Sequence, residues 1–284
     1  MNRYVDRVLA GIAPTVEDWH EHLVQFHDRY PDATSLMLDY LRVDGGTRSH
    51  EYFAERVHEE QPTSTDILDI GCGDGALLER LIATYGESPN VTGIDLSHSE
   101  IDRARSRLPQ GTFICGDAAS LLEQGAFDLI IAHLSLAIIP RLSEMLSSIR
   151  HMLRRDGLLA FVIEDPLSQS SFFGSLAAAI ARLRASHPQF APVMPGREPF
   201  EDDAALRAML RRAGFTDTRI EPYRLRGYVS ARQLWDLLQR AYPFGLLADD
   251  DQRDAAGAVE RESAARSDDG RIAVTLPLRM VFSR

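Results

Sequence analysis

Three glycines and two aspartates come together in the stretch DIGCGDG, residues 69–75, between an apolar run and a helical pattern. Gly71 and Gly73 permit a tight turn and close approach of the backbone to a ligand, and Gly75 lets a helix begin against that ligand. Three glycines in five residues cost much backbone entropy. We therefore expect this loop to bind a ligand rather than only to join two elements.

The glycines alone leave two kinds of cofactor open. A dinucleotide fingerprint, G-x-G-x-x-G/A, can be placed on Gly71, Gly73 and Ala76. Asp95 comes at the end of the next apolar run. A carboxylate there suits both cases, because every adenosine-bearing cofactor offers ribose hydroxyls.

Two further carboxylates and one missing residue type favour a cationic ligand. Asp69 precedes the glycines, where it would repel a pyrophosphate and suit a positive charge. Asp117, in CGDAASL, is placed to bind an adenine amine. The chain contains no lysine, so all 31 of its basic residues are arginine. This excludes a P-loop lysine, a Schiff-base lysine and the Tyr-x-x-x-Lys pair of many dehydrogenases.

Short apolar runs recur through the middle of the chain, with amphipathic segments between them. They predict strands at 65–70, 90–96, 112–117, 126–134 and 157–165. Strands about 25 residues apart with helices between them indicate a parallel sheet that is covered on both faces. Two more strands are predicted at 216–229 and 271–284. The fold class is therefore α/β.

At these residues the chain resembles the class I methyltransferases that use S-adenosyl-L-methionine (SAM). The resemblance is highly specific as a set and covers about residues 65–165. It implies a Rossmann-like, doubly wound and mostly parallel seven-stranded sheet with an antiparallel C-terminal strand. The matching stretches are DIGCGDG (69–75), GIDLS (93–97), CGDAASL (115–121), FDLIIAHLSL (127–136) and RHMLRRDGLLAF (150–161).

The resemblance also implies which residues hold SAM. Asp69 and the glycine loop would face the methionine part, Asp95 the ribose hydroxyls and Asp117 the adenine amine. The backbone around His133 would meet the cofactor's amino group. Arg48 is a candidate for the cofactor carboxylate, and the alternative for it is an ordinary surface arginine. The full predicted set is Arg48, Asp69, Gly71, Cys72, Gly73, Gly75, Asp95, Leu96, Asp117, Ala118 and His133.

The catalytic candidates are His133, His27 and Glu164. Many small-molecule members of the family carry a polar segment after the fourth strand, whereas this chain has LSLAIIP at 134–140. His133 is therefore the nearest titratable group, and its alternative role is that of a hydrogen-bonded pocket histidine. Glu164 ends the fifth predicted strand.

Four segments are predicted. Residues 1–60 form a helical N-terminal lid, 61–165 the SAM-binding core, 166–200 a helical insertion over the acceptor pocket, and 201–284 the helices and strands that complete the sheet. The prediction of a lid is based on WHEHLVQFHDRY (19–30), whose histidines and aromatics share helical faces. The alternative is an amphipathic helix docked for stability.

Composition limits the partners. A net charge of −11 argues against nucleic acid, because phosphate binding needs a clustered positive surface. The longest apolar run, at 129–139, is too short to span a bilayer, and residues 1–22 do not form a secretory signal. Two cysteines and the HEH of 20–22 offer no metal-binding spacing. We expect a cytoplasmic monomer or homodimer without a bound metal.

The sequence as a whole predicts a SAM-dependent methyltransferase that modifies an oxygen or nitrogen of a small molecule, of the secondary-metabolite type. Two alternatives stay open. One is a SAM-binding protein without methyl transfer, such as a sensor or a cyclase. The other is an NAD-dependent oxidoreductase.

Overall fold

The computed structural model describes residues 2–31, 33–86, 89–121, 125–165, 202–240, 249–264 and 271–284, together with Ala181 and Ala185. It divides into two compact units. Unit 1 comprises Met1–Arg48, Ser168–Pro195 and Arg224–Leu276, and unit 2 comprises Ser49–Leu167, Gly196–Tyr223 and Pro277–Arg284. The predicted insertion at 166–200 lies outside the described residues apart from the two alanines.

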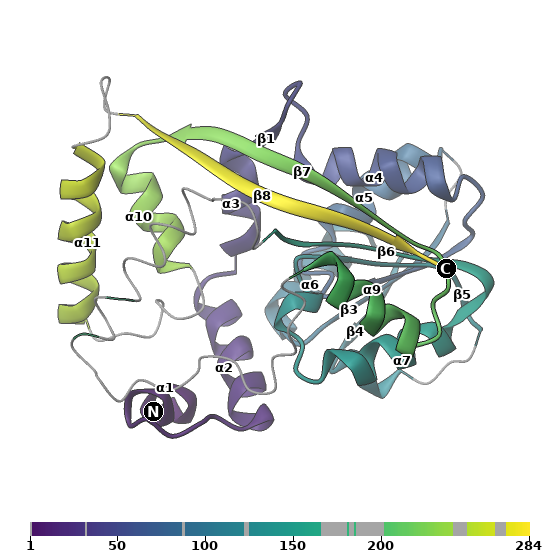
Figure 1. Ribbon diagram of the computed structural model, residues 1–284, viewed down its shortest axis with the longest axis horizontal. Helices are drawn as coiled ribbons and strands as arrows, with labels where there is room; N and C mark the ends of the chain where they lie inside the picture. The colour runs from purple at the N-terminus through teal and green to yellow at the C-terminus, as the bar shows by residue number, and fades with distance from the viewer. Residues whose placement is uncertain are drawn as a thin grey trace. The chain divides into compact units, whose positions relative to one another are not determined.

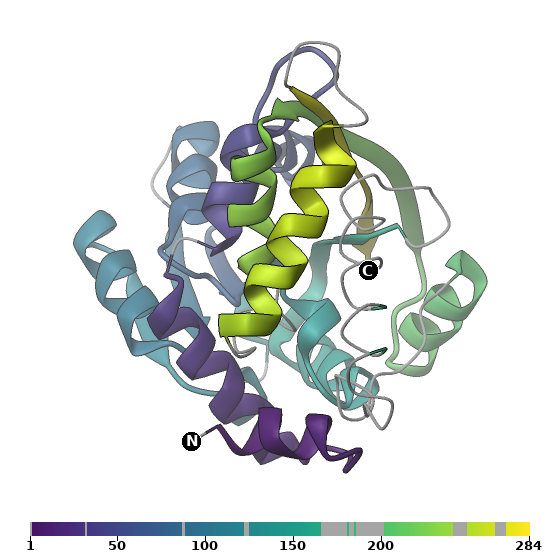
Figure 2. The same cartoon turned by 90° about the vertical axis from the view of Figure 1, so that its left-hand side faces the viewer.

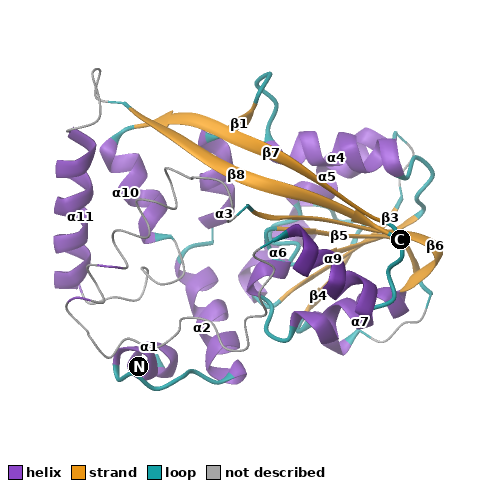
Figure 3. Ribbon diagram, in the orientation of Figure 1, coloured by secondary structure: helices purple, strands orange, loops and turns teal. Residues whose placement is uncertain are grey.

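The strands form one mixed sheet of eight (Figure 3), in the order β1-β7-β8-β6-β5-β2-β3-β4. Strands β4, β3, β2, β5 and β6 are parallel, whereas β8 is antiparallel to β6 and β1 is antiparallel to β7. The predicted Rossmann-like α/β fold is confirmed, and the two-residue β1 is a strand that the sequence pattern did not predict. The bounds are β1 (Arg42–Val43), β2 (Asp66–Ile70), β3 (Asn90–Asp95), β4 (Thr112–Cys115), β5 (Phe127–His133), β6 (Leu153–Glu164), β7 (Thr218–Val229) and β8 (Ile272–Ser283).

Helices cover both faces of the sheet in unit 2. Figures 1 and 2 show α4 and α5 on one side of it and α7 and α9 on the other. Side-chain caps set where several of these helices begin. Ser97 accepts a hydrogen bond from the N–H of Glu100 before α6, and Asp202 accepts one from Ala205 before α9. The bounds are α4 (Ser49–Glu60), α5 (Ala76–Tyr85), α6 (His98–Arg107), α7 (Leu142–Met152), α9 (Asp203–Arg212), and the 3₁₀ turns η1 (Ala118–Ser120) and η2 (Leu136–Ile138).

The core of unit 2 follows from the apolar strands. Leu68, Ile130 and Leu159 lie in register on β2, β5 and β6, and none of them is exposed. Leu146 of α7 and Leu210 of α9 belong to the same buried cluster. Strands that are buried on both faces read as nearly continuous apolar runs, which is why the sequence pattern located them well.

Among the elements that the structure describes, unit 1 contains α1, α2, α3, α10 and α11. Figures 1 and 2 show α10 and α11 side by side. Residues 1–48 of the predicted lid belong to unit 1, whereas α4 belongs to unit 2. The division into four segments stays a prediction. The bounds are α1 (Arg3–Leu9), α2 (Val16–Arg29), α3 (Ala33–Tyr40), α10 (Ala231–Gln239) and α11 (Asp249–Ala264).

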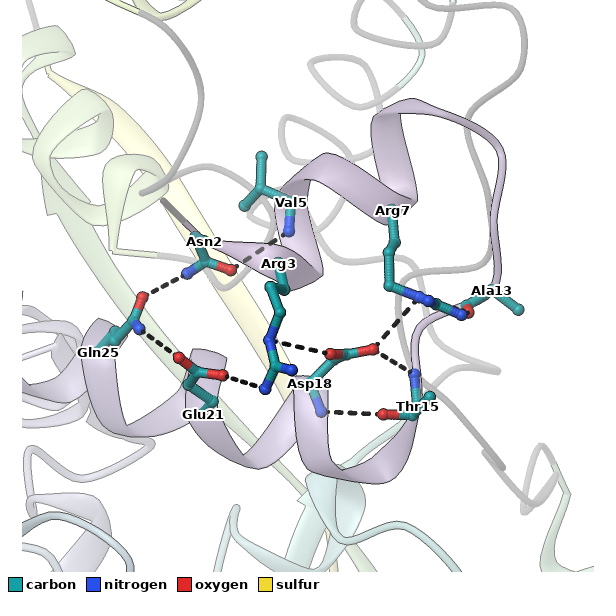
Figure 4. A network of polar contacts seen from close by, with 9 residues as sticks. All are labelled: Asn2, Arg3, Val5, Arg7, Ala13, Thr15, Asp18, Glu21 and Gln25. Carbon is teal, nitrogen blue, oxygen red and sulfur yellow. Dashed lines mark hydrogen bonds and ion pairs between the residues drawn. The ribbon is translucent and has the colours of Figure 1, made fainter.

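A polar network joins α1 to the start of α2 (Figure 4). Thr15 and Asp18 form a capping box, in which Asp18 N–H donates to Thr15 Oγ1 and Thr15 N–H donates to Asp18 Oδ2. The same buried carboxylate pairs with Arg7 at 3.3 Å and with Arg3 at 3.7 Å. The hydrogen bond from Thr15 is the main reason why the pKa of Asp18 is lowered. The cap of one helix therefore also binds its neighbour.

Aromatic contacts join the same two helices. Trp19, His22 and Phe26 lie on one buried face of α2, and the His22 ring stacks on Tyr4 of α1 at 3.9 Å. His27 is half-buried and meets Phe26 edge to face. His22 is therefore packed inside unit 1, whereas His20 and His27 of the same helix are more exposed.

Candidate cofactor-binding site

The glycine loop needs its glycines for backbone and steric reasons. Gly71, Gly73 and Gly75 have φ angles of +72°, +53° and +78°, a left-handed conformation that residues with a side chain rarely adopt. A Cβ added at Gly71 would lie 2.4 Å from the Cβ of Ser135, which belongs to the segment after β5. The loop therefore fits closely against the end of a neighbouring strand.

The predicted polar residues meet at the carboxyl edge of the parallel strands. Asp69 pairs with Gly93 of β3 and with Ile131 of β5, so three strands end side by side. Asp95 ends β3 and His133 ends β5. This edge is where open α/β sheets bind their ligands.

Hydrogen bonds attach the loop to β3. The Asp95 carboxylate accepts from the backbone N–H of Gly73 at 3.0 Å and from that of Ser97 at 2.9 Å. The N–H groups of Gly71 and Cys72 both donate to the carbonyl of Ile94. The side chain predicted to hold ribose therefore also fixes the loop.

Asp69 is the most unusual group at this edge. Its side chain is 1% exposed, and its Oδ1 has no hydrogen-bond partner among the described residues. Burial, together with the nearby charge of Asp95, raises its pKa to about 8. A buried carboxyl without a partner fits a ligand that brings a positive charge or a donor, as the ammonium group of SAM does.

The predicted adenine side of the site is more open. Asp117 is exposed, and its carboxylate accepts from the N–H of Ala119, where it caps η1. Ala118 is buried and Leu96 is half-buried. Cys72 is buried, and burial raises the pKa of its thiol, so the thiol is neutral at pH 7.

Sequence reasoning missed an arginine that holds the loop from α6. Arg107 Nε donates to the carbonyl of Asp74 at 3.0 Å, and the same guanidinium pairs with the carboxylates of Asp74 and Glu79. The sequence pattern places Arg107 on the helix after the second predicted strand, but it does not indicate which residues Arg107 contacts.

His133 takes part in a second group of residues that the sequence did not predict. Its Nε2 lies 2.9 Å from Ser49 Oγ, which in turn lies 3.2 Å from the hydroxyl of Tyr223. The ring of His50 meets the His133 ring edge to face at 4.7 Å. Burial, with a smaller contribution from His50, lowers the pKa of His133 well below its usual value, so this imidazole is neutral at pH 7.

The other predicted site residues belong to unit 1 or to the end of β6. Arg48 belongs to unit 1, where it pairs with Asp39 at 2.8 Å, and His27 also belongs to unit 1. Glu164 ends β6, is half-buried, and accepts a hydrogen bond from Arg279 at its backbone carbonyl. Their predicted roles stay predictions.

Two kinds of feature are absent from the described residues. No helix there is long and apolar enough to cross a membrane. No cluster of three or more histidine, cysteine or acidic side chains there could hold a metal ion.

Comparisons with known proteins place this site in a family. Residues 67–157 match the family model of the methyltransferase domain. Nocamycin O-methyltransferase of Saccharothrix syringae is 29% identical over 77% of this chain and 85% of its own. Trans-aconitate 2-methyltransferase of Methylobacterium nodulans is 33% identical, over 46% of this chain and 50% of its own.

Two solved structures share the fold at low sequence identity. YcgJ of Bacillus subtilis has a TM-score of 0.56 and 16% identity, over 82% of this chain and 98% of its own. The [4+2]-cyclase SpnF has a TM-score of 0.57 and 20% identity, over 96% and 97%. Residues 67–157 therefore form a methyltransferase domain, of the SAM-dependent type that the sequence motifs predict.

Proposed function

We propose that the protein transfers the methyl group of SAM to an oxygen atom of a small molecule, of the secondary-metabolite type. The observation that carries this proposal is the similarity to an O-methyltransferase over 85% of that relative's length. The alignment covers 77% of this chain, whereas the matched methyltransferase domain spans only 67–157. The similarity therefore extends into the segments outside the matched domain.

In the proposed complex, three carboxylates bind the donor groups of the cofactor. Asp69 and the glycine loop face the methionine part, Asp95 the ribose hydroxyls and Asp117 the adenine amine. The buried, unpartnered Oδ1 of Asp69 supports its part in this assignment. Arg48 remains the proposed partner of the cofactor carboxylate.

The chemistry asks little of the protein beyond alignment. SAM supplies an activated methyl group on a sulfonium. The residues around the site then hold the acceptor oxygen in line with that group and exclude water, and such alignment can lower a barrier by about 7–11 kcal/mol. A base is needed only when the oxygen carries a proton, and His27 and Glu164 remain the candidates for that role.

The test supplies SAM with a ¹³C-labelled methyl group and a panel of small molecules that carry hydroxyl, carboxyl or amine groups. We expect a methylated product by mass spectrometry, with the ¹³C chemical shift of a methyl group on oxygen. A methyl group on nitrogen or carbon would overturn the acceptor assignment.

A second measurement separates methyl transfer from simple binding. A protein that only binds SAM is stabilised against heat by SAM and yet transfers no label to any member of the panel. That result would favour the non-transferring alternative. Asp95→Ala is the control variant, because weaker cofactor binding should reduce both the thermal shift and the transfer at a limiting SAM concentration.

A further inference from the structure

Ser49, His133 and Tyr223 form a hydrogen-bonded chain that lies within unit 2. Ser49 begins α4, His133 ends β5 and Tyr223 lies on β7, so the three come from distant parts of the sequence. Ser49 is 0% exposed, and His133 and Tyr223 are 7% and 8% exposed. Buried hydroxyl and imidazole groups usually have partners for each proton that they carry.

The direction in which the hydrogen bonds of Ser49, His133 and Tyr223 run follows from the protons that these residues carry. If Tyr223 O–H donates to Ser49 Oγ, then Ser49 O–H donates to His133 Nε2, and both hydroxyl protons have partners. In the opposite direction, the proton on Nε2 points at Ser49, Ser49 donates to Tyr223, and the tyrosine proton is left without an acceptor among the described residues. The first direction leaves fewer buried groups unsatisfied, and burying a polar group without a partner is destabilising.

The first direction also decides the state of the imidazole. Nε2 accepts from Ser49, so a neutral ring must carry its proton on Nδ1. That Nδ1 is buried and has no hydrogen-bond partner in the described part of the chain. A donor of this kind can bind an acceptor atom of a bound molecule.

We propose that His133 presents its Nδ1–H as a fixed hydrogen-bond donor to the oxygen of the methyl acceptor, and that Ser49 and Tyr223 are the positioning residues that set this state. The proposal rests on the proposed function. The ammonium group and the adenine amine, assigned to Asp69 and Asp117, are donors only. The ribose hydroxyls can also accept but are assigned to Asp95, and the cofactor carboxylate is assigned to Arg48, so none of these groups is left to receive the proton of His133. The oxygen of the methyl acceptor can receive it.

This role differs from that of a general base. Ser49 of α4 contacts His133, and Tyr223 of β7 contacts Ser49. The titratable His50 and the apolar Phe53 face the ring from α4. None of these neighbours carries a negative charge that would stabilise an imidazolium ion. The ring therefore stays neutral and orients its partner rather than removing a proton.

The test is ¹⁵N NMR of the full chain with labelled histidine, and it needs no methyl acceptor. We expect the His133 signals of an Nδ1–H tautomer, unchanged between pH 6 and pH 8. His133→Asn identifies the signals by removing them. An Nε2–H tautomer, or titration of His133 in this range, would overturn the proposal.

Variants of the two partners test their positioning role. Tyr223→Phe removes only the hydroxyl, and Ser49→Ala removes the donor to Nε2. Both should move the two nitrogen signals of His133 toward each other, with the larger change in Ser49→Ala. Tyr52→Phe is the matched control, because the Tyr52 ring contacts that of Tyr223. If Ser49→Ala does not fold, Tyr223→Phe alone decides, and unchanged signals in it would overturn the positioning role.

A titration with S-adenosylhomocysteine identifies which molecule accepts the hydrogen bond from His133 Nδ1–H. We expect the Nδ1–H proton to keep its shift when this cofactor product saturates the protein. A large change would show that His133 donates to the cofactor and would overturn its assignment to the acceptor. Failure of methyl transfer in the labelled-SAM experiment would leave the tautomer measurement intact, so the two proposals fail separately.

Discussion

The carboxylate of Asp95 accepts a hydrogen bond of 3.0 Å from the backbone N–H of Gly73. One side chain therefore connects the end of β3 to the middle of the glycine loop. The groups that would hold the ribose and the methionine part of the cofactor are mechanically linked, and a change at Asp95 should affect both.

Asp95→Ala should weaken SAM binding by about tenfold or more, because hydrogen bonds to a charged group contribute about 1.5–3 kcal/mol. Calorimetry measures the dissociation constant. Asp117→Ala is the comparison, and we expect a smaller loss because Asp117 is exposed. A dissociation constant within twofold of the wild-type value in Asp95→Ala would contradict the ribose assignment.

The ligand-free protein should lose stability as the pH rises, because of Asp69. Its pKa is raised to about 8, whereas an unfolded aspartate titrates near 3.8. Between these values the folded state holds a proton that the unfolded state has lost. The free energy of unfolding should therefore fall by up to about 1.4 kcal/mol per pH unit in this window. Denaturant titrations of wild type and Asp69→Asn measure the slope, and equal slopes would show that Asp69 is ionised in the folded protein.

Gly71→Ala should weaken SAM binding by more than tenfold and destabilise the fold, because the new Cβ would overlap with Ser135 in a left-handed backbone. Ser135→Gly removes the overlapping atoms. The double variant should recover part of the loss, with only the backbone strain of about 1–2 kcal/mol remaining. Unfolding and binding free energies of the two single variants and the double variant measure the coupling. Simply additive losses would mean that the two residues do not meet.

His27→Ala tests the predicted lid. We expect SAM affinity within about twofold of the wild-type value and a lower turnover, since lids complete a site and exclude water. His20→Ala is the matched control on the same helix, with similar exposure. His22→Ala should instead lower stability, because His22 is buried against Tyr4. Full turnover in both His20→Ala and His27→Ala would show that the segment serves packing alone.

Arg48→Ala separates a cofactor contact from a surface ion pair. If Arg48 binds the cofactor carboxylate, its removal should weaken SAM binding by about tenfold. Asp39→Ala removes its ion-pair partner and should leave the affinity unchanged. Equal dissociation constants for both variants and the wild type, measured by calorimetry, would identify Arg48 as a surface residue.

The sequence located the parallel strands because each is an apolar run between clear helical patterns. β6 is the exception, since it begins at Leu153 and not at 157. Leu153 pairs with Phe127, but Arg155 and Asp156 are exposed. A charged stretch of this kind shows no strand pattern in the sequence. It is part of a strand because β6 pairs with β5.

The candidate site shows the same difference between residues that a local sequence pattern marks and residues that only the fold brings together. Asp69 and Asp95 were predictable because they stand beside the ends of strands in a local motif. Ser49 lies 84 residues from His133 in the sequence, and Tyr223 lies 174 residues from Ser49. No local pattern marks either residue, and the sheet topology alone brings them together.

The two compact units are interleaved along the chain. Each consists of three separate stretches, and both β7 and β8 change unit partway along their length. Neither unit is a single contiguous fragment of the chain. Recombination between relatives at one crossover point would therefore split a unit rather than exchange it.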